Sequence, residues 1–212
     1  LDTSRGLGDV YKRQIQIRFG KRQARMGIIV FDSYFALHDM ADYQWAVPVD
    51  LLLSVARRES EFDQYAKSSA GALGLMQVMP GTAKEMAKNL KIPFEEESLV
   101  TSWKYNVLLG ATYLQELSYR YRGNPILIAA SYNAGPSNAD KWIQHLGSPL
   151  DRKTNLVDWV EMIPFRETRN YVMRITESLT LYKTLVLGKE IDHEFSEFLG
   201  SSAYFSFTPQ SE

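Results

Sequence analysis

Apolar residues recur at intervals of three and four along most of this chain, beginning near Trp45. Leu52, Val55 and Ala56 follow Pro48 at helical spacing, and Glu59 completes the same face one turn later. No segment stands out with the alternating pattern of a half-buried strand. The pattern therefore predicts an all-α domain over roughly residues 45–188. Its longest central stripe comprises Trp103, Val107, Gly110, Leu114, Leu117 and Tyr121.

Several helix ends are also visible in the sequence. Thr82 and Glu85 have the spacing of a capping box, which predicts a helix start there. Asn124 and Pro125 resemble an N-cap and a first helical position, with Gly135 ending that helix. Two further helices are expected over residues 138–145, closed by Gly147, and over 165–187, with Val172, Ile175, Leu179 and Tyr182 on one face.

The segments on either side of this domain have a different composition. Residues 1–25 are basic and show little apolar periodicity, so we interpret them as a linker, a tag-like segment or the remnant of a preceding domain. The alternative is a tail that binds nucleic acid or an anionic surface. Residues 26–44 are expected to form a connecting helix, and residues 189–212 a polar and aromatic C-terminal tail.

The composition allows one globular domain and argues against a metal site, a polyanionic partner and a membrane span. The 212 residues are 45% hydrophobic, which suffices for one globular domain, and the formal net charge of −1 demands no polyanionic partner. There is no cysteine, and His38, His145 and His193 have no metal-ligand spacing, so neither metal nor cofactor is expected. The apolar run at residues 27–31 is too short for a bilayer span or a signal segment.

Glu59 is the first candidate for catalysis. Its helical register places it with residues that face the core, near the end of the helix. Burial disfavours a charged carboxylate, and so does the negative potential at a helix C-terminus, so this carboxyl is suited to general acid catalysis. The alternative is a buried glutamate paired with Arg57, Arg58 or another cation.

A loop of small residues follows, from Ser68 to Gln77, and contains Gly71 and Gly74. Glycines permit close approach of the backbone to a ligand, and Ser68 and Gln77 could donate hydrogen bonds into a cleft. Glycine-rich turns more often have only a structural role. The spacing of a phosphate-binding loop is absent, which argues against a nucleotide ligand.

Three motifs occur in order, and together they carry a resemblance. They are Glu59-Ser60, then Gly-Ala-Leu-Gly-Leu-Met-Gln-Val-Met-Pro at residues 71–80, then Ala-Ser-Tyr-Asn-Ala-Gly-Pro at residues 130–136. The sequence resembles the catalytic domain of the soluble lytic transglycosylases, which shares a lysozyme-like core with goose-type lysozyme. Residues 159–172 resemble the continuation found in the large periplasmic members. The resemblance covers about residues 44–187. In the larger members a long helical superstructure precedes this domain, and if residues 26–43 are its end, this chain would be a C-terminal fragment.

The resemblance also implies roles for individual residues. Glu59 would be the only catalytic acid/base, and Ser68 would orient an N-acetyl sugar in the substrate cleft. The remaining positions would contact substrate or line the cleft, and Tyr132 and Asn133 would stabilise the intermediate. From the residues alone, Tyr132 could be an ordinary buried tyrosine, Asn133 a helix cap and Glu161 a surface ion-pair member. Ser131 stands where alanine is common in the family. The positions expected to bind substrate are Ser68, Gln77, Met79, Tyr132, Asn133, Glu161 and Tyr171.

The implied reaction is cleavage of the MurNAc-β-1,4-GlcNAc bond of peptidoglycan, with formation of 1,6-anhydro-MurNAc and without a second carboxylate. Alternatives are a lysozyme-type hydrolase on the same fold and a glycan-binding module without activity. A third alternative, an all-α nucleic-acid-binding domain, rests only on the basic N-terminal segment. The resemblance implies a monomer acting on glycan strands in the bacterial periplasm or cell envelope, with no nucleic acid partner.

Overall fold

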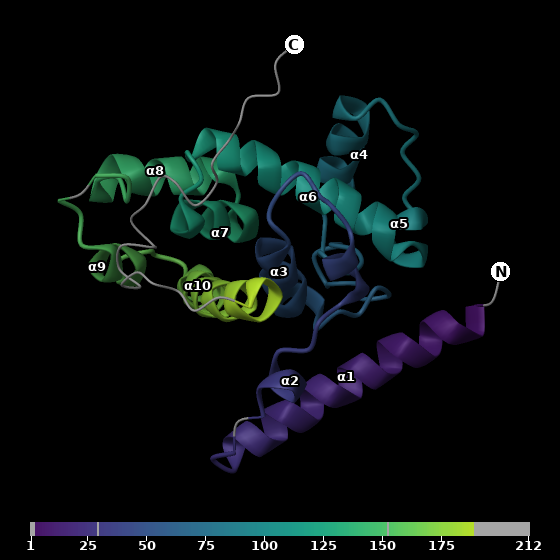
Figure 1. Ribbon diagram of the computed structural model, residues 1–212. Coiled ribbons are helices and arrows are strands. Elements are labelled where there is room, and N and C mark those ends of the chain that lie inside the picture. The colour runs from purple at the N-terminus through teal and green to yellow at the C-terminus, as the bar shows by residue number, and fades with distance from the viewer. Residues whose placement is uncertain (1–2, 29, 152, 189–212) are drawn as a thin grey trace. The chain divides into compact units, whose positions relative to one another are not determined.

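The computed structural model describes residues 3–28, 30–151 and 153–188, and these residues are mainly helical (Figure 1). Within them no extended strand forms, and β-pairing is limited to isolated bridges at Lys67, Leu73 and Val78. The prediction of an all-α fold is therefore confirmed. The tail at residues 189–212 lies outside the described residues. The α-helices are α1 (Thr3–Arg25), α2 (Phe31–Tyr34), α3 (Val49–Ser60), α4 (Pro80–Asn89), α5 (Ser98–Thr101), α6 (Trp103–Arg120), α7 (Pro125–Ala134), α8 (Pro136–Leu146), α9 (Leu156–Glu161) and α10 (Arg166–Leu187), and η1 (Asp39–Asp42) is a 3-10 helix.

The chain divides into two compact units. Unit 1 consists of Leu1–Trp45 and Val49–Thr112, and unit 2 consists of Ala46–Pro48 and Tyr113–Glu212. The division falls inside α6. Sequence periodicity predicted one continuous domain over residues 45–188 and did not indicate this boundary.

The N-terminal region differs from the sequence prediction. Residues 3–25, interpreted as a linker or remnant, form helix α1, whose Ile17 is fully buried. Gly20 lies against α2 so closely that an added Cβ would be 2.7 Å from the backbone of Ser33. The prediction of a single connecting helix over residues 26–44 is wrong. Gly27 adopts a φ of 80° after α1, and only the short α2 and η1 follow before residue 44.

Helix α3 forms the centre of unit 1. Every residue from Asp50 to Ala56 is buried, so the helix is enclosed on all sides and not only on its predicted apolar face. The helix ends at Ser60 because the next two residues, Glu61 and Phe62, adopt left-handed φ values of 54° and 65°. Phe62 is itself fully buried, which fixes the path of the chain beyond the helix.

Helix α4 begins before the predicted capping box. Its N-cap is Met79, with Pro80 at the first helical position and no side-chain cap. Thr82 therefore lies inside the first turn, and the predicted role of Thr82 and Glu85 as a capping box is wrong. Proline at the first position already has the helical φ and lacks one of the N–H groups that a cap would satisfy.

Unit 2 is built around α7. All of its residues from Pro125 to Ser131 are buried, and it packs against α8 and α10. The predicted cap is confirmed, because the Asn124 side chain accepts a hydrogen bond from the Leu127 N–H at 3.1 Å. Gly135, at a φ of 84°, ends α7 and leads directly into α8, which Gly147 closes as predicted.

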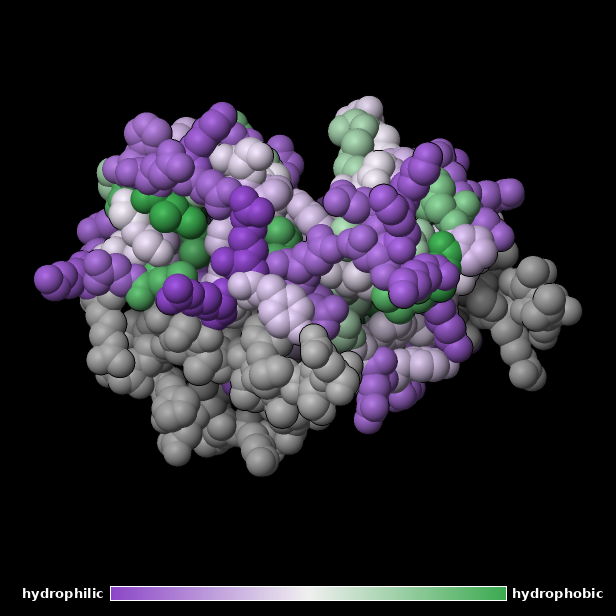
Figure 2. All heavy atoms as spheres, turned by 90° about the horizontal axis from the view of Figure 1, so that it is seen from above, coloured by the Kyte–Doolittle hydropathy of each residue, from purple (hydrophilic) through white to green (hydrophobic). Residues whose placement is uncertain are grey.

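The surface in Figure 2 is mostly hydrophilic, and its hydrophobic residues form small separate groups. Among the helices of the described part of the chain, none combines the length and apolarity needed to cross a membrane.

Candidate active site

Glu59 lies in the last turn of α3 and is half-buried. Its neighbour Arg57 is held elsewhere, because the guanidinium donates to the Tyr34 carbonyl at 2.9 and 3.1 Å. The same guanidinium lies 4.5 Å from the centre of the Phe35 ring. Arg57 therefore anchors the chain that precedes α3, and the burial of residues 50–56 holds the helix that carries Glu59 in place.

The end of α3 is tied to the glycine-containing loop by Ser60. Its hydroxyl donates to the Leu75 carbonyl at 2.7 Å and approaches the Ala56 carbonyl at 3.3 Å. This bond joins the residue after Glu59 to the middle of the loop. The Glu-Ser pair therefore combines a candidate acid with the residue that fixes the loop beside it.

Two other carboxylates near Glu59 have visible partners. Glu61 forms an ion pair with Lys21 of α1. Asp63 accepts a hydrogen bond from the Tyr65 N–H at 2.9 Å and starts a turn.

The loop that contains Ser68 is a network of backbone hydrogen bonds. Leu73 and Val78 exchange two bonds of 3.0 Å, and the Gly74 N–H donates to the Ala66 carbonyl at 2.8 Å. Ser68 is exposed, and its hydroxyl oxygen accepts from the Ala72 N–H at 2.9 Å. The Ser68 hydroxyl is used there as an acceptor, so its own proton can still be donated to a ligand.

Gln77 has a structural task that the sequence did not indicate. Its backbone adopts a φ of 48°, and its side-chain amide donates to the carbonyls of Gly74 and Ala66 at 2.9 and 3.1 Å. These bonds hold the loop together, so the side-chain nitrogen is already occupied. Met79 is 45% exposed at the start of α4, where its side chain is available for contact.

Asn106 is the residue that sequence reasoning missed. It is fully buried in the first turns of α6. Its amide donates to the carbonyls of Leu73 and Leu99 at 2.9 and 3.0 Å, and its oxygen accepts from the Met76 N–H at 2.7 Å. A signal was present, because Asn106 follows Trp103 by three residues and therefore falls on the apolar stripe.

Gly74 is required where the loop meets Asn106. Its φ is 74°, and an added Cβ would lie 2.1 Å from the Leu99 carbonyl oxygen and 2.4 Å from the Asn106 amide nitrogen. No other residue fits without moving the backbone. Of the two roles open to this glycine from the sequence, Gly74 has the structural one, because it permits close approach of Leu99 and Asn106.

Unit 2 holds the second group of predicted residues. Tyr132 is half-buried, with its ring 5.5 Å from that of Tyr113. The side-chain oxygen of Asn133 accepts from the Thr168 hydroxyl at 2.7 Å, which joins α7 to α10. Asn133 is therefore not the cap of α7, because Gly135 has that position.

Glu161 and Tyr171 differ in exposure. Glu161 is exposed at the last position of α9 and borders a cavity of about 500 Å³, otherwise lined mainly by apolar residues of α7, α9 and α10. Tyr171 is only 2% exposed, so it offers little surface to a ligand. Its contact with substrate stays a prediction.

His38 and Asp140, which lie outside the predicted set, have pKa values that depart from their ordinary range. Burial is the main cause that lowers the pKa of His38 to about 3, Arg13 adds to the effect and Asp39 opposes it. A hydrogen bond from Arg120 is the main cause that lowers the pKa of Asp140. Both residues have structural roles, in η1 and α8 respectively.

Comparison with known proteins identifies the class to which this helical fold and its motifs belong. Residues 36–155 match the model of the transglycosylase SLT domain, which is more than half of the chain. The chain belongs to this family, and the predicted resemblance is confirmed.

The matching relatives are much longer proteins. A Haemophilus influenzae relative is 40% identical over 145 residues, which are 68% of this chain and 24% of its own length. The soluble lytic murein transglycosylase of Escherichia coli K12 is 36% identical over 130 residues, which are 61% of this chain and 20% of its own length. The chain thus spans about a quarter or less of these relatives.

A solved structure agrees with this relationship. The lytic transglycosylase Slt of Pseudomonas aeruginosa superposes with a TM-score of 0.67 at 31% identity, covering 75% of this chain and 26% of that one. That structure is of an inactive variant in which one glutamate is replaced by glutamine.

Proposed function

We propose that this chain is the catalytic domain of a peptidoglycan lytic transglycosylase, with Glu59 as its only acid/base residue. The observation that carries the proposal is the position of Glu59, half-buried in the last turn of the enclosed helix α3 and next to the Ser60 link to the loop. Family membership supports the reaction class. The inactive glutamate-to-glutamine variant of the Pseudomonas relative is consistent with a single essential glutamate.

We infer that the substrate itself takes part, since neither described carboxylate that follows Glu59 closely in the chain is assigned as its catalytic partner. Glu61 is paired with Lys21, and Asp63 is engaged in a turn, so neither is presented as a second catalytic group. In the proposed reaction the N-acetyl group of the muramyl sugar takes the place of the enzymatic nucleophile.

The reaction proceeds in two steps. Glu59 gives its proton to the glycosidic oxygen, and the C1–O bond breaks as the N-acetyl oxygen attacks C1 to form an oxazolinium ion. Glu59, now a carboxylate, takes the proton of the muramyl O6 hydroxyl, and O6 attacks C1 to close the 1,6-anhydro ring and release the N-acetyl oxygen. Glu59 is protonated again and no water is consumed, so the enzyme is a lyase.

The other residues have supporting roles in this proposal. Ser68 donates its hydroxyl proton to an N-acetyl sugar, and Met79 contributes an apolar contact. Tyr132 and Asn133 stabilise the charge that develops on the sugar. Gln77 shapes the loop and contacts the glycan through its remaining oxygen, whereas Glu161 and Tyr171 border the substrate.

The setting of this activity follows from the substrate class. We propose that the domain acts as a monomer on peptidoglycan glycan strands in the bacterial periplasm or cell envelope. No cofactor, metal or nucleic acid takes part in the proposed reaction.

The decisive test is mass spectrometry of fragments released from purified sacculi. We expect products that end in 1,6-anhydro-muramic acid, lighter by one water than hydrolytic products. Glu59→Gln should reduce the rate by about three orders of magnitude or more, because the amide cannot donate and retake the proton. Glu85→Gln, at an exposed position on α4, is the matched control and should keep wild-type activity.

Two outcomes would contradict the proposal. Products with a reducing-end muramic acid would indicate a lysozyme-type hydrolase. Activity of the Glu59→Gln variant comparable to that of the wild type would show that Glu59 is not the catalytic acid/base residue.

A further inference from the structure

Tyr121 is a buried tyrosine that the proposed reaction does not use. It directly follows α6 and is only 3% exposed. Its hydroxyl points to two acceptors, the Asp140 carboxylate oxygen Oδ1 at 3.0 Å and the Pro136 carbonyl oxygen at 3.2 Å, which share its single proton. Both acceptors belong to α8, so this phenol ties the end of α6 to the first two turns of α8.

The Asp140 carboxylate is itself held in place. Its other oxygen, Oδ2, accepts a hydrogen bond from the Arg120 guanidinium. That bond is the main cause that lowers the pKa of Asp140, so the carboxylate stays charged near neutral pH. A charged acceptor makes a stronger hydrogen bond than a neutral one, so Asp140 is a firm attachment point for the Tyr121 hydroxyl.

The phenol contacts the chain on both sides of the predicted pair Tyr132 and Asn133. The Ser131 hydroxyl is buried beside it, because burial raises the pKa of Tyr121 and the Ser131 hydroxyl opposes this rise. Ser131 immediately precedes Tyr132, and Pro136 follows Asn133 by three residues. The Tyr121 hydroxyl therefore lies against the residues that flank the pair.

The turn between α7 and α8 has few other fixed points. Only Gly135 separates the two helices, and its φ is 84°. A Cβ added to it would meet no atom within 4 Å, so packing does not restrict this flexible residue. Asn138 contributes one bond, from its side-chain amide to the Ala134 carbonyl at 2.7 Å. The direction of the last turn of α7 thus depends on a small number of polar contacts.

We propose that Tyr121 is a positioning residue, whose hydroxyl, held by Asp140, keeps the turn that carries Tyr132 and Asn133 in the orientation that the reaction requires. The inference rests on the proposed function, which assigns this pair to the charge that develops on the sugar. A misplacement of about 1 Å can lower a rate by about a hundredfold, so loss of one bond at this turn should be measurable. Ser131, which stands where alanine is common in the family, provides a polar neighbour for the buried hydroxyl.

Steady-state kinetics of anhydro-product release from glycan test this role. In the 212-residue chain, Tyr121→Phe removes only the hydroxyl. We expect kcat to fall about fivefold and KM to stay within about twofold, because the glycan contacts outside this turn remain. Tyr182→Phe is the matched control, since it removes the hydroxyl of another fully buried tyrosine of unit 2 and should leave kcat unchanged within about twofold.

Two further comparisons test whether Tyr121 acts through Asp140 and Tyr132. When Tyr132→Phe is already present, adding Tyr121→Phe should lower kcat by less than about twofold, because the hydroxyl to be positioned is absent. Asp140→Asn keeps an oxygen that accepts from the phenol and should retain at least about half of the wild-type kcat. Asp140→Ala removes the acceptor and should match Tyr121→Phe.

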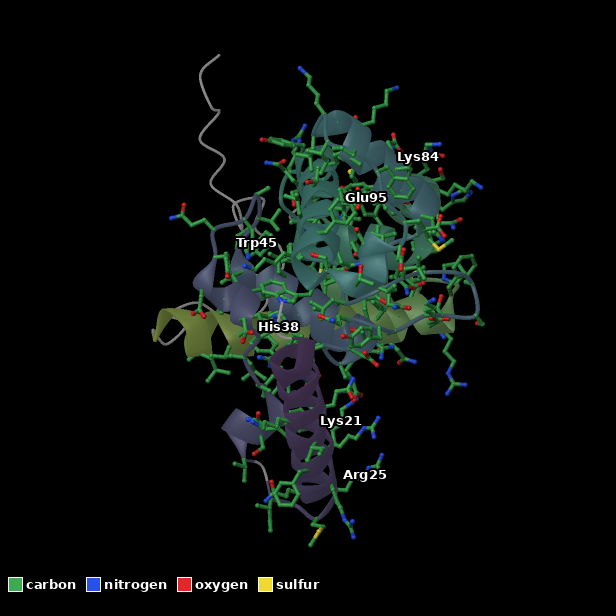
Figure 3. The ribbon with its side chains drawn as sticks, turned by 90° about the vertical axis from the view of Figure 1, so that its right-hand side faces the viewer. Lys21, Arg25, His38, Trp45, Lys84 and Glu95 are labelled. Carbon is green, nitrogen blue, oxygen red and sulfur yellow. The ribbon has the colours of Figure 1, made fainter. Side chains whose placement is uncertain are left out.

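Loss of Arg120 should have a smaller effect. The side chains of its ion pair with Asp140 are 53% and 34% exposed, so Arg120→Gln should lower kcat by no more than about twofold. Lys84, labelled on α4 in Figure 3, is an exposed cation elsewhere in the chain. Lys84→Gln is therefore the matched control for charge and should leave kcat unchanged.

Three kinetic results would overturn the inference. They are a kcat of Tyr121→Phe no lower than that of Tyr182→Phe, effects of Tyr121→Phe and Tyr132→Phe on kcat that multiply in full, and a loss of kcat in Asp140→Asn as large as in Asp140→Ala.

Amide hydrogen exchange separates this inference from the proposed function. The Gly135 N–H donates to the Ser131 carbonyl at 2.8 Å and should exchange at least about tenfold faster in Tyr121→Phe, but not in Tyr182→Phe. Unchanged exchange at Gly135 would overturn the positioning role whatever the products are. Failure of the proposed function appears as missing anhydro products from the wild-type chain and leaves this exchange comparison intact.

Discussion

The two units hold their predicted site residues in different ways. In unit 1 the loop after α3 has irregular backbone, and a few polar groups hold it, namely Asn106, Ser60 and the Gln77 amide. In unit 2 the helix that carries Tyr132 and Asn133 is regular, and apolar packing surrounds it along most of its length.

This difference indicates where each unit is vulnerable. Irregular backbone leaves carbonyl and N–H groups that only specific partners can satisfy, so one substitution can remove several bonds at once. A regular helix satisfies its own backbone, so its stability is spread over many side-chain contacts. We therefore expect substitutions that remove the polar anchors of the unit 1 loop to alter activity per folded molecule, and truncation of buried apolar residues in unit 2 to alter mainly stability.

Gly74→Ala should have the largest effect on stability. The new Cβ would collide with backbone and with Asn106, and alanine disfavours the φ of 74°. We expect a loss of about 4 kcal/mol or more in the free energy of unfolding, measured by urea denaturation. Gly71→Ala is the control, because Gly71 has a φ of 90° but no atom within 4 Å of an added Cβ, so only about 1 kcal/mol should be lost. Equal losses in the two variants would contradict the clash.

Leu127→Ala tests the apolar packing of unit 2. Leu127 is fully buried in α7, and its truncation should cost about 3 kcal/mol in unfolding free energy. The kcat/KM per folded molecule on glycan should stay within about twofold. Val157→Ala, at a position 66% exposed, should change stability by less than about 0.5 kcal/mol. A large drop in kcat/KM for Leu127→Ala would remove the contrast between the units.

Asn106→Leu tests the polar anchoring of unit 1. The substitution leaves the carbonyls of Leu73 and Leu99 and the N–H of Met76 without their partner, which should cost about 3 kcal/mol. Unlike Leu127→Ala, this variant should also lose at least tenfold in kcat/KM at temperatures where it is fully folded, because the loop beside Glu59 is released. Asn106→Asp keeps the acceptor for Met76 but buries a carboxylate against the Leu73 and Leu99 carbonyl oxygens, so at neutral pH it should lose at least as much stability as the leucine variant. Unchanged kcat/KM in Asn106→Leu would show that the loop does not depend on this residue.

The pH dependence of the stability of unit 1 should be a smaller effect than those of the substitutions above. The pKa of His38 is about 3 in the folded protein and about 6.5 when unfolded, so the unfolded chain binds the extra proton between these values. Stability contributed by neutral His38 is therefore complete above about pH 6.5 and is lost as the pH falls towards 3, by up to about 1.4 kcal/mol per pH unit. His38→Asn can still cap η1 and should show a shallower decline in urea denaturation between pH 6.5 and 4.5. Parallel declines in the two proteins would contradict this role.

Helix periodicity and end signals predicted much of the fold. The stripe of α6, the Asn124 cap and the Gly147 stop depend on interactions within a few residues, and such signals are readable from sequence. The prediction failed where distant contacts decided the outcome. Helix α1 has weak periodicity but packs Gly20 against α2, and α4 begins at Pro80 and not at the capping-box pattern.

The candidate site likewise has features that the sequence predicted and features that depend on distant contacts. The ordered motifs identified the family and placed Glu59 near a helix end, because helical register and chain order are properties of the sequence. The partners of Gln77, the three bonds of Asn106 and the link from Asn133 to Thr168 join residues that are apart in the sequence.

By itself, then, the sequence determined the all-α class, the family and the position of Glu59 on its helix. Only the tertiary structure decided that Asn106 and Gly74 hold the loop, that Gln77 supports it, and that the Tyr121 hydroxyl meets Asp140 and Pro136 of α8. The physical reason is the distance along the chain over which each kind of interaction acts. Helical propensity and capping act over one or two turns, whereas hydrogen bonds, close packing and charge pairing depend on which distant segments the fold brings into contact.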